Sequence, residues 1–500
     1  MIPLGELLNN TGVISGVDAA AAALPITGIA YDTRVLEGGN AFWAFAGANV
    51  DGRKFAPAAV ERGAAAVVSE LEPLQPLGVP WIRVADARRA LALAAGRFYG
   101  HPDESLAITG VTGTNGKTTT TWILDQILRT SGRTTALIGT IGYHVAGEPR
   151  KAINTTPESV DLFKMFAELK AKSGTHATME VSSHALSLGR VHRVRFHTAV
   201  FTNLTRDHLD FHKTMEDYFA AKQMLFEGPP APKFAVINDD DEYGKELQPD
   251  STTEVIRYGI RSGDLRAHRI ESSIDGLRFE IRLGDQRYFV ESPLVGEINV
   301  YNLLAAAGAA YTLGLSWPVI LEGLRAAKAV PGRFERVEAG QPFLVVVDYA
   351  HTDDALRNTI GVARKIAAGK KGRVLTLFGC GGDRDRTKRP LMGMAAAELS
   401  DFVALTSDNP RSEDPLAIMN DALVGLRRSD TPHIVEPDRE KAIFATIAEA
   451  RSGDVVILAG KGDEHYQVLR DRIIDFDDRE VARRALLKTG YGLHGTRGAA

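Results

Sequence analysis

This 500-residue chain has few of the features that mark secreted or membrane proteins. It contains one cysteine, Cys380, which cannot form an internal disulfide and is compatible with a reducing compartment. No apolar run is long enough to cross a bilayer. The first basic residue is Arg34, so no charged segment precedes an apolar one as in a secretory signal. These absences predict a cytoplasmic protein without membrane insertion.

The chain also lacks an excess of either charge. Its 59 basic and 63 acidic residues leave a formal net charge of −4, which gives no reason to expect a nucleic-acid partner. Hydrophobic residues make up 44% and charged residues 24%, the proportions of ordinary globular domains. At roughly 150 residues per domain, the length predicts about three domains.

Breaks in the sequence pattern divide the chain into three parts. The first, residues 1–101, ends near Gly100-His101-Pro102, and the second, residues 102–330, ends where Val330-Pro331-Gly332 interrupts the pattern. The third covers residues 331–500. Strand-like apolar runs alternate with helical patterns, which favours α/β folds. We expect a central parallel-sheet domain like that of P-loop ATPases and a Rossmann-like domain at the C-terminus.

A glycine-rich loop at residues 109–119 is the most informative stretch, with the sequence Thr-Gly-Val-Thr-Gly-Thr-Asn-Gly-Lys-Thr-Thr. It joins an apolar run to a helical pattern, as in sites for nucleotide triphosphates. Glycines let backbone N–H groups approach the phosphates, lysine reaches the terminal phosphates, and a hydroxyl binds Mg²⁺. The usual spacing would place a glycine at Val111, so the loop is a variant. The predicted nucleotide ligands are Gly113, Thr114, Asn115, Gly116, Lys117, Thr118 and Thr119.

Unusual polar residues follow six of the apolar runs. These clusters are Glu180-Val-Ser-Ser-His184, Asn203-Leu-Thr-Arg-Asp-His208, Asp348-Tyr-Ala-His351, Gly379-Cys-Gly-Gly-Asp-Arg384, Ser407-Asp-Asn-Pro-Arg411 and Gly460-Lys-Gly-Asp-Glu464. In parallel sheets, ligands bind beyond the carboxyl ends of the strands. Six clusters in two adjacent parts are therefore predicted to form binding sites rather than solvated loops.

Together these motifs resemble the Mur ligase family over about residues 30–485. The loop Gly113-Thr-Asn-Gly-Lys-Thr-Thr119 is also similar to that of the folylpolyglutamate synthetases. The motifs that appear in the Mur ligase order are Asn154-Thr-Thr-Pro157, Met179-Glu-Val-Ser-Ser-His184, Asn203-Leu-Thr-Arg-Asp-His208, Asn299-Val-Tyr-Asn302, Asp348-Tyr-Ala-His351 and Asp408-Asn-Pro-Arg411. Each motif alone is a weak signal, but the ordered set is specific.

The resemblance implies an ATP- and Mg²⁺-dependent ligase of peptidoglycan precursor synthesis, and so a part in cell shape and division. ATP would convert a carboxylate into an acyl phosphate, which an amine then attacks. The expected substrates are UDP-N-acetylmuramoyl-dipeptide, ATP and meso-diaminopimelate. Residues 1–101 would bind the UDP-sugar, residues 102–330 ATP, and residues 331–500 the amino acid. We expect a monomer.

The central site is predicted from chemistry and from the resemblance. Mg²⁺ prefers oxygen ligands, so Thr118 and Glu180 are plausible ligands. The resemblance adds His208 and a carbamylated Lys222, although Lys222 by itself reads as an ordinary lysine on a helix. The predicted catalytic residues are Lys117, Glu180, His208 and Lys222. The resemblance further places Asn302, Asp348 and His351 at the nucleoside and Arg333 at the phosphates. Asn299 and Asn302 could also be helix caps, and Arg333 a surface residue of a linker.

The resemblance assigns the other two substrates as well. The residues predicted at the muramoyl substrate are Thr33, Asn154, Thr155, Thr156, Ser182 and Arg190. Those predicted at diaminopimelate are Arg384, Asp408, Asn409, Pro410, Arg411, Gly460 and Glu464. Diaminopimelate is lysine with a second carboxylate, and a guanidinium gives that carboxylate two parallel hydrogen bonds. Arg411 is therefore the predicted discriminator between the two amino acids.

Four residues depart from the family pattern: Leu188, Asp353, Asp463 and His465. The alternatives are a lysine-adding ligase, a folylpolyglutamate synthetase, a P-loop kinase or GTPase, and a binding protein without activity. A folylpolyglutamate synthetase would not explain the motifs Asn154-Thr-Thr-Pro157 and Asp408-Asn-Pro-Arg411. A binding protein would be favoured by loss of Lys117 or Glu180, and both are present.

Overall fold

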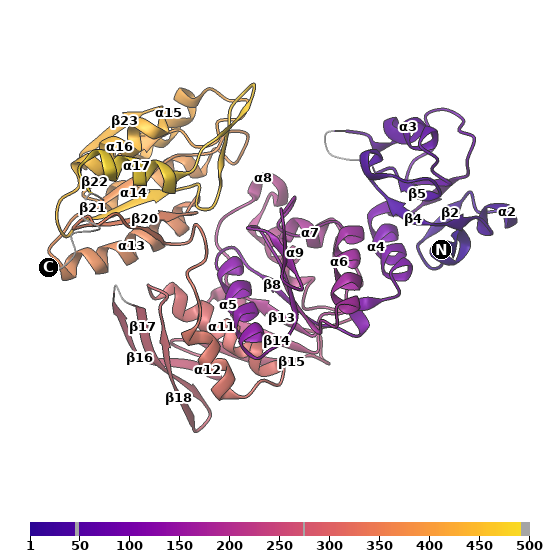
Figure 1. The fold of residues 1–500 in the computed structure, drawn as a ribbon, viewed down its shortest axis with the longest axis horizontal. Coiled ribbons are helices and arrows are strands. Elements are labelled where there is room, and N and C mark those ends of the chain that lie inside the picture. Colours follow the sequence, from indigo (N-terminus) through magenta and orange to yellow (C-terminus); the bar gives the residue numbers. More distant parts are fainter. Residues whose placement is uncertain (46–49, 274–275, 492–500) are drawn as a thin grey trace, which may run out of the picture.

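The computed structural model describes residues 1–45, 50–273 and 276–491. They form three lobes, each built around its own large sheet (Figure 1). The N-terminal and C-terminal lobes lie at opposite ends of the molecule, and the central lobe lies between them. Within the described ranges, no helix is both long and apolar enough to cross a membrane.

The N-terminal lobe contains a five-stranded sheet in the order β2-β7-β6-β5-β4. Its strands are β2 (Val13–Ser15), β4 (Gly28–Ala30), β5 (Asn40–Trp43), β6 (Ala66–Ser69) and β7 (Trp81–Val84). Helix α4 (Ala87–Phe98) links this lobe to the next by packing against α6 (Ser159–Ala171). The contact is close, because a Cβ added at Gly96 would lie 3.3 Å from the Phe163 ring.

The central lobe contains an eleven-stranded sheet, parallel through its middle and antiparallel at both ends. Its parallel strands are β8 (Ala107–Thr112), β9 (Thr135–Ile138), β12 (His176–Glu180), β13 (Thr198–Phe201), β14 (Phe234–Asn238) and β15 (Glu254–Gly259). The ends are β10 (Tyr143–Val145) and β11 (Glu148–Arg150), and β16 (Leu265–Ser273), β17 (Gly276–Leu283) and β18 (Gln286–Ser292).

Helices cover both faces of the central sheet, because its buried strands are apolar on both sides. Ala199 and Phe201 belong to the core that includes α6, whereas Val200, between them, faces the opposite core. The opposite core is built on α5 (Lys117–Thr130), α11 (Ile298–Thr312) and α12 (Trp317–Arg325).

The C-terminal lobe contains a six-stranded sheet in the order β19-β20-β24-β21-β22-β23. Its strands are β19 (Glu335–Val337), β20 (Leu344–Asp348), β21 (Val374–Phe378), β22 (Phe402–Thr406), β23 (His433–Glu436) and β24 (Val455–Ala459), of which β19 runs antiparallel. Helices α13 (Asp353–Gly369), α14 (Lys388–Leu399) and α15 (Pro415–Leu426) pack in one core. Helices α16 (Arg439–Glu449) and α17 (Asp478–Lys488) pack in the other.

The predicted parallel α/β architecture is confirmed. Each of the six polar clusters begins at or just after the end of a strand, namely β12, β13, β20, β21, β22 and β24. The antiparallel extension formed by β16, β17 and β18 was not predicted. It widens the central sheet beyond β15 without contributing to the predicted motifs.

Candidate active site

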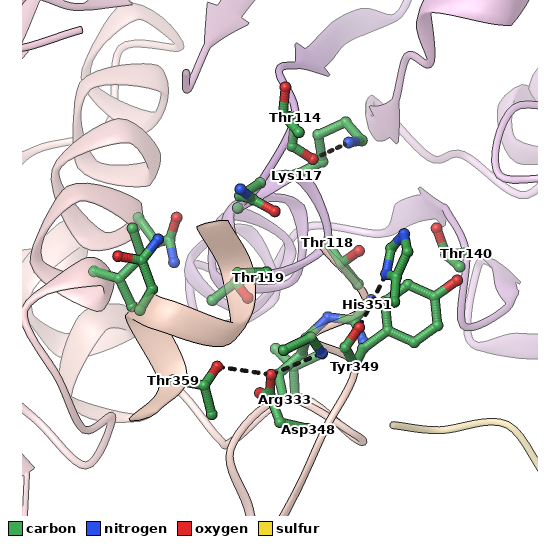
Figure 2. Close-up of a pocket in the computed structure, with 18 of the residues that line it drawn as sticks. Thr114, Lys117, Thr118, Thr119, Thr140, Arg333, Asp348, Tyr349, His351 and Thr359 are labelled. Carbon is green, nitrogen blue, oxygen red and sulfur yellow. Dashed lines mark hydrogen bonds between the residues drawn. The ribbon is translucent and has the colours of Figure 1, made fainter. Parts of the chain in front are cut away.

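A cavity of about 270 Å³ lies between the central and C-terminal lobes. Figure 2 shows the start of α5 and the Arg333–His351 segment facing it. The predicted site residues that line the cavity are Thr114, Asn115, Gly116, Lys117, Thr118, Thr119, Thr155, Glu180, Ser182, His208, Lys222, Asn302, Arg333, Asp348 and His351. The structure therefore brings together residues that are up to 237 positions apart in the chain, from Thr114 to His351.

The glycine-rich loop has the predicted form, with β8 ending at Thr112 and α5 beginning at Lys117. Gly113 has a φ of 144°, and an added Cβ would lie 1.9 Å from the Thr202 hydroxyl oxygen. Gly116 has a φ of 87°, and an added Cβ would lie 2.5 Å from a side-chain oxygen of Asn302. Both positions therefore require glycine. The loop delivers the N-terminus of a 14-residue helix to the cavity, where backbone N–H groups favour anions.

Lys117 lies at the first position of α5 with its ammonium inside the loop. Its Nζ donates hydrogen bonds to the carbonyl oxygens of Gly113 at 2.8 Å and Thr114 at 2.7 Å (Figure 2). Burial lowers the pKa of this amine, and Glu180 and Asp207 oppose that change. A lysine at the start of a helix, directly after a glycine-rich loop, suits a phosphate chain.

Glu180 stands at the end of β12, beside the nucleotide loop. Its side chain accepts hydrogen bonds from the Thr118 hydroxyl at 3.0 Å and the Thr140 backbone N–H at 2.8 Å. A buried carboxylate next to a hydroxyl gives the oxygen ligands that Mg²⁺ takes alongside phosphate oxygens. Among the described residues, no three His, Cys, Asp or Glu side chains form a ready-made metal cluster. The donor set thus fits an ion shared with a nucleotide better than an all-protein cage.

Lys222 is buried. The interpretation of Lys222 as an ordinary, solvent-exposed lysine on a helix is therefore wrong. It lies on α9 (Met215–Gln223), is 1% exposed, and donates from Nζ to the Gly113 carbonyl at 2.9 Å. Its ammonium lies 4.5 Å from the Tyr218 ring centroid. Burial and the charge of Lys117 hold the pKa of Lys222 well below its usual value. An uncharged amine is the form that reacts with carbon dioxide to give a carbamate.

His208 precedes α8 (Leu209–His212) in a left-handed conformation, with a φ of 54°. Its Nε2 lies 3.4 Å from an Asp207 carboxylate oxygen, and His351 Nε2 lies 3.9 Å from the same oxygen. Burial lowers the pKa of His208 to about 3 and that of His351 to about 4, so both rings are neutral. Asp207 was not among the predicted site residues, although it precedes His208 in the same cluster.

Apolar residues from both lobes also line the cavity. Leu294, Val295, Ile298 and Val362 line it together with Asn299 and Asn302. The alternative that these two asparagines cap a helix is wrong, because α11 begins at Ile298 and already contains them. Asn302 lies instead against the loop, with its side-chain oxygen accepting from Thr120 at 3.4 Å. An apolar lining with amide groups suits a nucleotide base.

Asp348 is the last residue of β20, and its side chain is hydrogen-bonded to other residues of the C-terminal lobe. It accepts hydrogen bonds from Phe334 N at 2.7 Å, Ala350 N at 2.9 Å and the Thr359 hydroxyl at 3.0 Å (Figure 2). Burial raises the pKa of this carboxyl. The aspartate therefore anchors the linker that carries Arg333.

Arg333 does not behave as a free surface arginine. Its guanidinium lies 4.2 Å from the Tyr349 ring centroid, and Nη1 lies 3.7 Å from an Asp463 carboxylate oxygen. The side chain is 20% exposed and lines the cavity. Asp463, a departure from the family pattern, is thus the acidic neighbour of this arginine.

The predicted muramoyl-substrate residues are divided between the cavity and the border with the N-terminal lobe. Thr155 and Ser182 line the cavity, while the Thr156 hydroxyl donates to the Glu180 carbonyl at 2.9 Å. Thr156 and the other three, Thr33, Asn154 and Arg190, lie outside the cavity lining. Thr33 begins the short 3₁₀ turn Thr33–Val35 on the N-terminal lobe.

Glu158 joins the two lobes beside these residues and was missed by the sequence reasoning. Its Oε1 accepts from Arg88 of the N-terminal lobe at 2.7 Å and from Arg190 at 2.9 Å. A second link runs from the Tyr31 hydroxyl to Asp161 at 2.5 Å. Glu158 directly follows the Asn154-Thr-Thr-Pro157 motif, which was the available signal.

The predicted diaminopimelate residues form a second cluster on the C-terminal lobe, outside the cavity lining. Asn409 donates from Nδ2 to Glu464 at 2.8 Å, and its side-chain oxygen accepts from Lys461 Nζ at 3.1 Å. Lys461 is fully buried and lies 3.4 Å from Asp408 and 3.5 Å from Glu464. Sequence reasoning missed Lys461, because a lysine between glycines gives no sign of burial.

Arg411 lies at the edge of this cluster and is half-buried. Its Nη1 donates to the Gly382 carbonyl at 2.7 Å. Among the described residues, no carboxylate lies within 4.0 Å of its guanidinium. Arg384 is exposed nearby on the loop after β21.

One contact between the lobes reaches the nucleotide loop itself. Asn115 donates from Nδ2 to Asp354 at 2.9 Å, and Asp354 lies in the first turn of α13. The departure at Asp353 does not disturb this turn, because the Thr352 side chain caps the helix by accepting from Ala355 N at 3.2 Å. The C-terminal lobe thus touches a predicted phosphate-binding residue.

The chain belongs to the Mur ligase family. The matching family descriptions are "Mur ligase family, catalytic domain" over residues 25–99, "Mur ligase middle domain" over residues 111–310, and "Mur ligase, glutamate ligase domain" over residues 332–462. The whole chain is also similar to proteins named UDP-N-acetylmuramoyl-L-alanyl-D-glutamate–2,6-diaminopimelate ligase. The one from Solibacter usitatus (strain Ellin6076) is 60% identical over 496 residues, covering 99% of both chains. That from Geobacillus thermodenitrificans (strain NG80-2) is 47% identical, covering 92% of this chain and 95% of its own.

Solved structures agree with this placement. A structure of a ligase with the same name superimposes with a TM-score of 0.69 and 33% identity, covering 98% of this chain and 99% of its own. The MurF ligase from Thermotoga maritima in complex with ADP has a TM-score of 0.64 at 19% identity and covers 93% of this chain and 97% of its own. The second likeness supports the fold alone.

Proposed function

We propose that this chain adds 2,6-diaminopimelate, in its meso form, to UDP-N-acetylmuramoyl-L-alanyl-D-glutamate at the expense of ATP. The relatives of 47% and 60% identity carry this activity in their names and match nearly the whole chain. The observation that carries the choice of amino acid is Arg411, a guanidinium without a carboxylate partner among the described residues. The chemistry belongs to peptidoglycan precursor synthesis, and through it to cell shape and division. The single cysteine supports a cytoplasmic site of action.

The reaction requires a carboxylate to be activated before an amine can attack it. A carboxylate of the dipeptide attacks the terminal phosphorus of ATP, which releases ADP and leaves an acyl phosphate. The amino group of the amino acid then attacks the acyl carbon, and phosphate leaves. Lys117 and the N-terminus of α5 offset the phosphate charge, and the apolar lining beside Asn299 and Asn302 orients the base.

Magnesium fits this site as a partner of the phosphates. Thr118 and Glu180 would hold it, with His208 as a further ligand. When bound, Mg²⁺ supplies positive charge where negative charge accumulates on the transferring phosphoryl group. The carboxylate and hydroxyl oxygens beside the loop are the ligand type that this ion prefers.

The three lobes divide the substrates between them in this proposal. Residues 1–101 hold the UDP-sugar, residues 102–330 hold ATP, and residues 331–500 hold the amino acid. The cluster around Arg411 does not line the nucleotide cavity, so the amine must be brought to the acyl phosphate across the border between two lobes. The Asn115–Asp354 hydrogen bond crosses that border and supports such a coupling.

Lysine is the rival amino acid, and one observation favours diaminopimelate. Lysine has no second carboxylate, so it would leave the Arg411 guanidinium unpaired at the edge of the cluster. The carboxylate of diaminopimelate offers that guanidinium two parallel hydrogen bonds. A P-loop kinase or GTPase would need no amino-acid site on the C-terminal lobe.

The proposal is tested by measuring phosphate release with the purified protein. Release should require ATP, Mg²⁺, the UDP-dipeptide and diaminopimelate together, and omission of any one should remove it. Steady release without diaminopimelate would indicate hydrolysis or transfer to another acceptor, and the ligase assignment would be wrong.

Lys222→Ala is expected to lose activity about tenfold, as found when groups that support a metal site are removed. Short carboxylic acids should restore part of the activity, because their oxygens can stand in for those of a carbamate on Lys222. The measurement is turnover of the variant with and without added acetate or formate. Full activity of Lys222→Ala without any added acid would show that the amine has no part in catalysis.

A further inference from the structure

A buried arginine on the C-terminal lobe lies directly behind the segment that contacts Arg411. Arg389, on α14, has a fully buried side chain. It donates to both carboxylate oxygens of Glu413, at 2.7 and 3.0 Å, and from Nη1 to Asp421 at 2.9 Å. A buried guanidinium is tolerated only with such partners, so this ion pair is held in one geometry.

The same pair fixes the backbone on either side of Gly382. Arg389 Nη2 donates to the Gly381 carbonyl at 3.2 Å, and the Asp383 N–H donates to Glu413 at 2.6 Å. Between these two contacts, the Gly382 carbonyl accepts the hydrogen bond from Arg411 Nη1 at 2.7 Å. The acceptor that orients the Arg411 guanidinium is therefore held by the Arg389–Glu413 pair on both sides.

The two loops involved are packed with no space for a side chain between them. Gly382 N donates to the Asn409 carbonyl at 2.9 Å, and a Cβ added at Gly382 would lie 1.9 Å from the Pro410 carbonyl oxygen. A Cβ added at Gly381 would lie 3.0 Å from Arg411 Nη1 itself. Any shift of residues 381–383 would therefore displace the Arg411 side chain as well.

We propose that the Arg389–Glu413 ion pair fixes the position of the Arg411 guanidinium and thereby determines the preference for diaminopimelate over lysine. The inference rests on the proposed function, because it assumes that Arg411 receives the second carboxylate of the amino acid. Neither member of the pair lines the nucleotide cavity, so they act through Arg411 rather than on a substrate.

The competing explanation is that the pair only stabilises the lobe. A substitution at Asp421 distinguishes this explanation from the positioning role. Asp421 on α15 contacts Arg389 at 2.9 Å and Arg386 at 3.1 Å. Its hydrogen bonds do not reach residues 381–383. Asp421→Asn therefore removes one partner of Arg389 but keeps the Glu413 contacts with Arg389 and Asp383, which makes it the matched control for Glu413→Gln.

The experiment compares kcat/KM for diaminopimelate and for lysine in the unmodified enzyme, Glu413→Gln and Asp421→Asn. Glu413→Gln should lower the diaminopimelate-to-lysine ratio about tenfold, because a displacement of 1 Å in a positioning group can cost about 100-fold. The KM for ATP should stay within about twofold, since the nucleotide cavity is untouched. Asp421→Asn should keep the ratio of the unmodified enzyme.

Gly381→Ala provides a second route that leaves the ion pair intact. The added methyl group pushes directly on Arg411 Nη1, and the backbone at Gly381 is not in the left-handed region, so the lobe should fold. It should lower the same ratio by about tenfold. This variant decides the question if Glu413→Gln does not fold.

The outcomes separate the inference from the function on which it rests. If the unmodified enzyme uses lysine and diaminopimelate with equal kcat/KM, the proposed function is wrong and the inference is wrong with it. If the unmodified enzyme discriminates and Glu413→Gln and Gly381→Ala discriminate equally well, the inference alone is overturned. A ratio lowered equally by Asp421→Asn would also overturn it, because general loosening of the lobe would then explain the effect.

Discussion

Lys117→Ala should lower ligase turnover by about 100- to 1,000-fold, the cost of removing one preorganised charge from a transition state. Its ammonium lies at the helix start, is hydrogen-bonded to the Gly113 and Thr114 carbonyls, and lines the cavity. The fold should survive, because the side chain spans only its own loop, and the Gly113 carbonyl keeps the hydrogen bond from Lys222. Turnover by phosphate release, together with a thermal unfolding curve, measures both effects.

Lys164→Ala is the matched control for this change. Lys164 is an exposed lysine on α6, and its truncation should leave both turnover and the melting temperature unchanged. Unchanged turnover in a folded Lys117→Ala protein would remove the glycine loop from the nucleotide site. A protein that no longer folds would require Lys117→Met, which keeps the apolar part of the side chain and lacks only the charge.

Arg411→Ala should lower kcat/KM for diaminopimelate by about 10- to 100-fold while changing that for lysine little. A charge-assisted pair contributes about 1.5–3 kcal/mol, and about 1.4 kcal/mol corresponds to a factor of ten. Only diaminopimelate loses such a pair, because lysine has no second carboxylate to offer. Steady-state kinetics with both amino acids on both proteins gives the two ratios.

Arg427→Ala controls for the loss of one positive charge from the C-terminal lobe. Arg427 is exposed at the end of α15, so its truncation should leave the preference between the amino acids unchanged. Equal losses with lysine and diaminopimelate in Arg411→Ala would mean that Arg411 supports the loop rather than the second carboxylate.

Much of the fold and of the nucleotide site could be predicted because strand ends and glycines leave strong signals. All six apolar runs form strands, and the polar clusters lie at their carboxyl ends, the edge where ligands bind in parallel sheets. The loop at Gly113 and Gly116 was recognisable because contacts at these positions exclude any side chain.

Residues that act through burial could not be predicted in the same way. Lys222 and Lys461 look like solvated lysines in sequence, and only the packing around them shows that they are almost fully buried. The antiparallel strands β16, β17 and β18 carry no motif, so nothing marked them as an extension of the central sheet.

Contacts between lobes also could not be predicted from local sequence patterns. Asp354 and Glu158 each contact residues on another lobe, which depends on how the lobes are arranged rather than on neighbours in sequence. Asn299 and Asn302 were ambiguous for a different reason. Helix boundaries are poorly defined by sequence, and α11 begins at Ile298, ahead of both asparagines.

The most direct test of the account is a competition experiment read by mass spectrometry. Purified protein is incubated with UDP-N-acetylmuramoyl-L-alanyl-D-glutamate, ATP and Mg²⁺ in an equimolar mixture of meso-diaminopimelate and L-lysine. The account predicts an amide product with the mass of the diaminopimelate adduct, exceeding the lysine adduct by about tenfold or more. Equal amounts of the two adducts would contradict the role of Arg411, and ADP without any amide product would contradict the ligase itself.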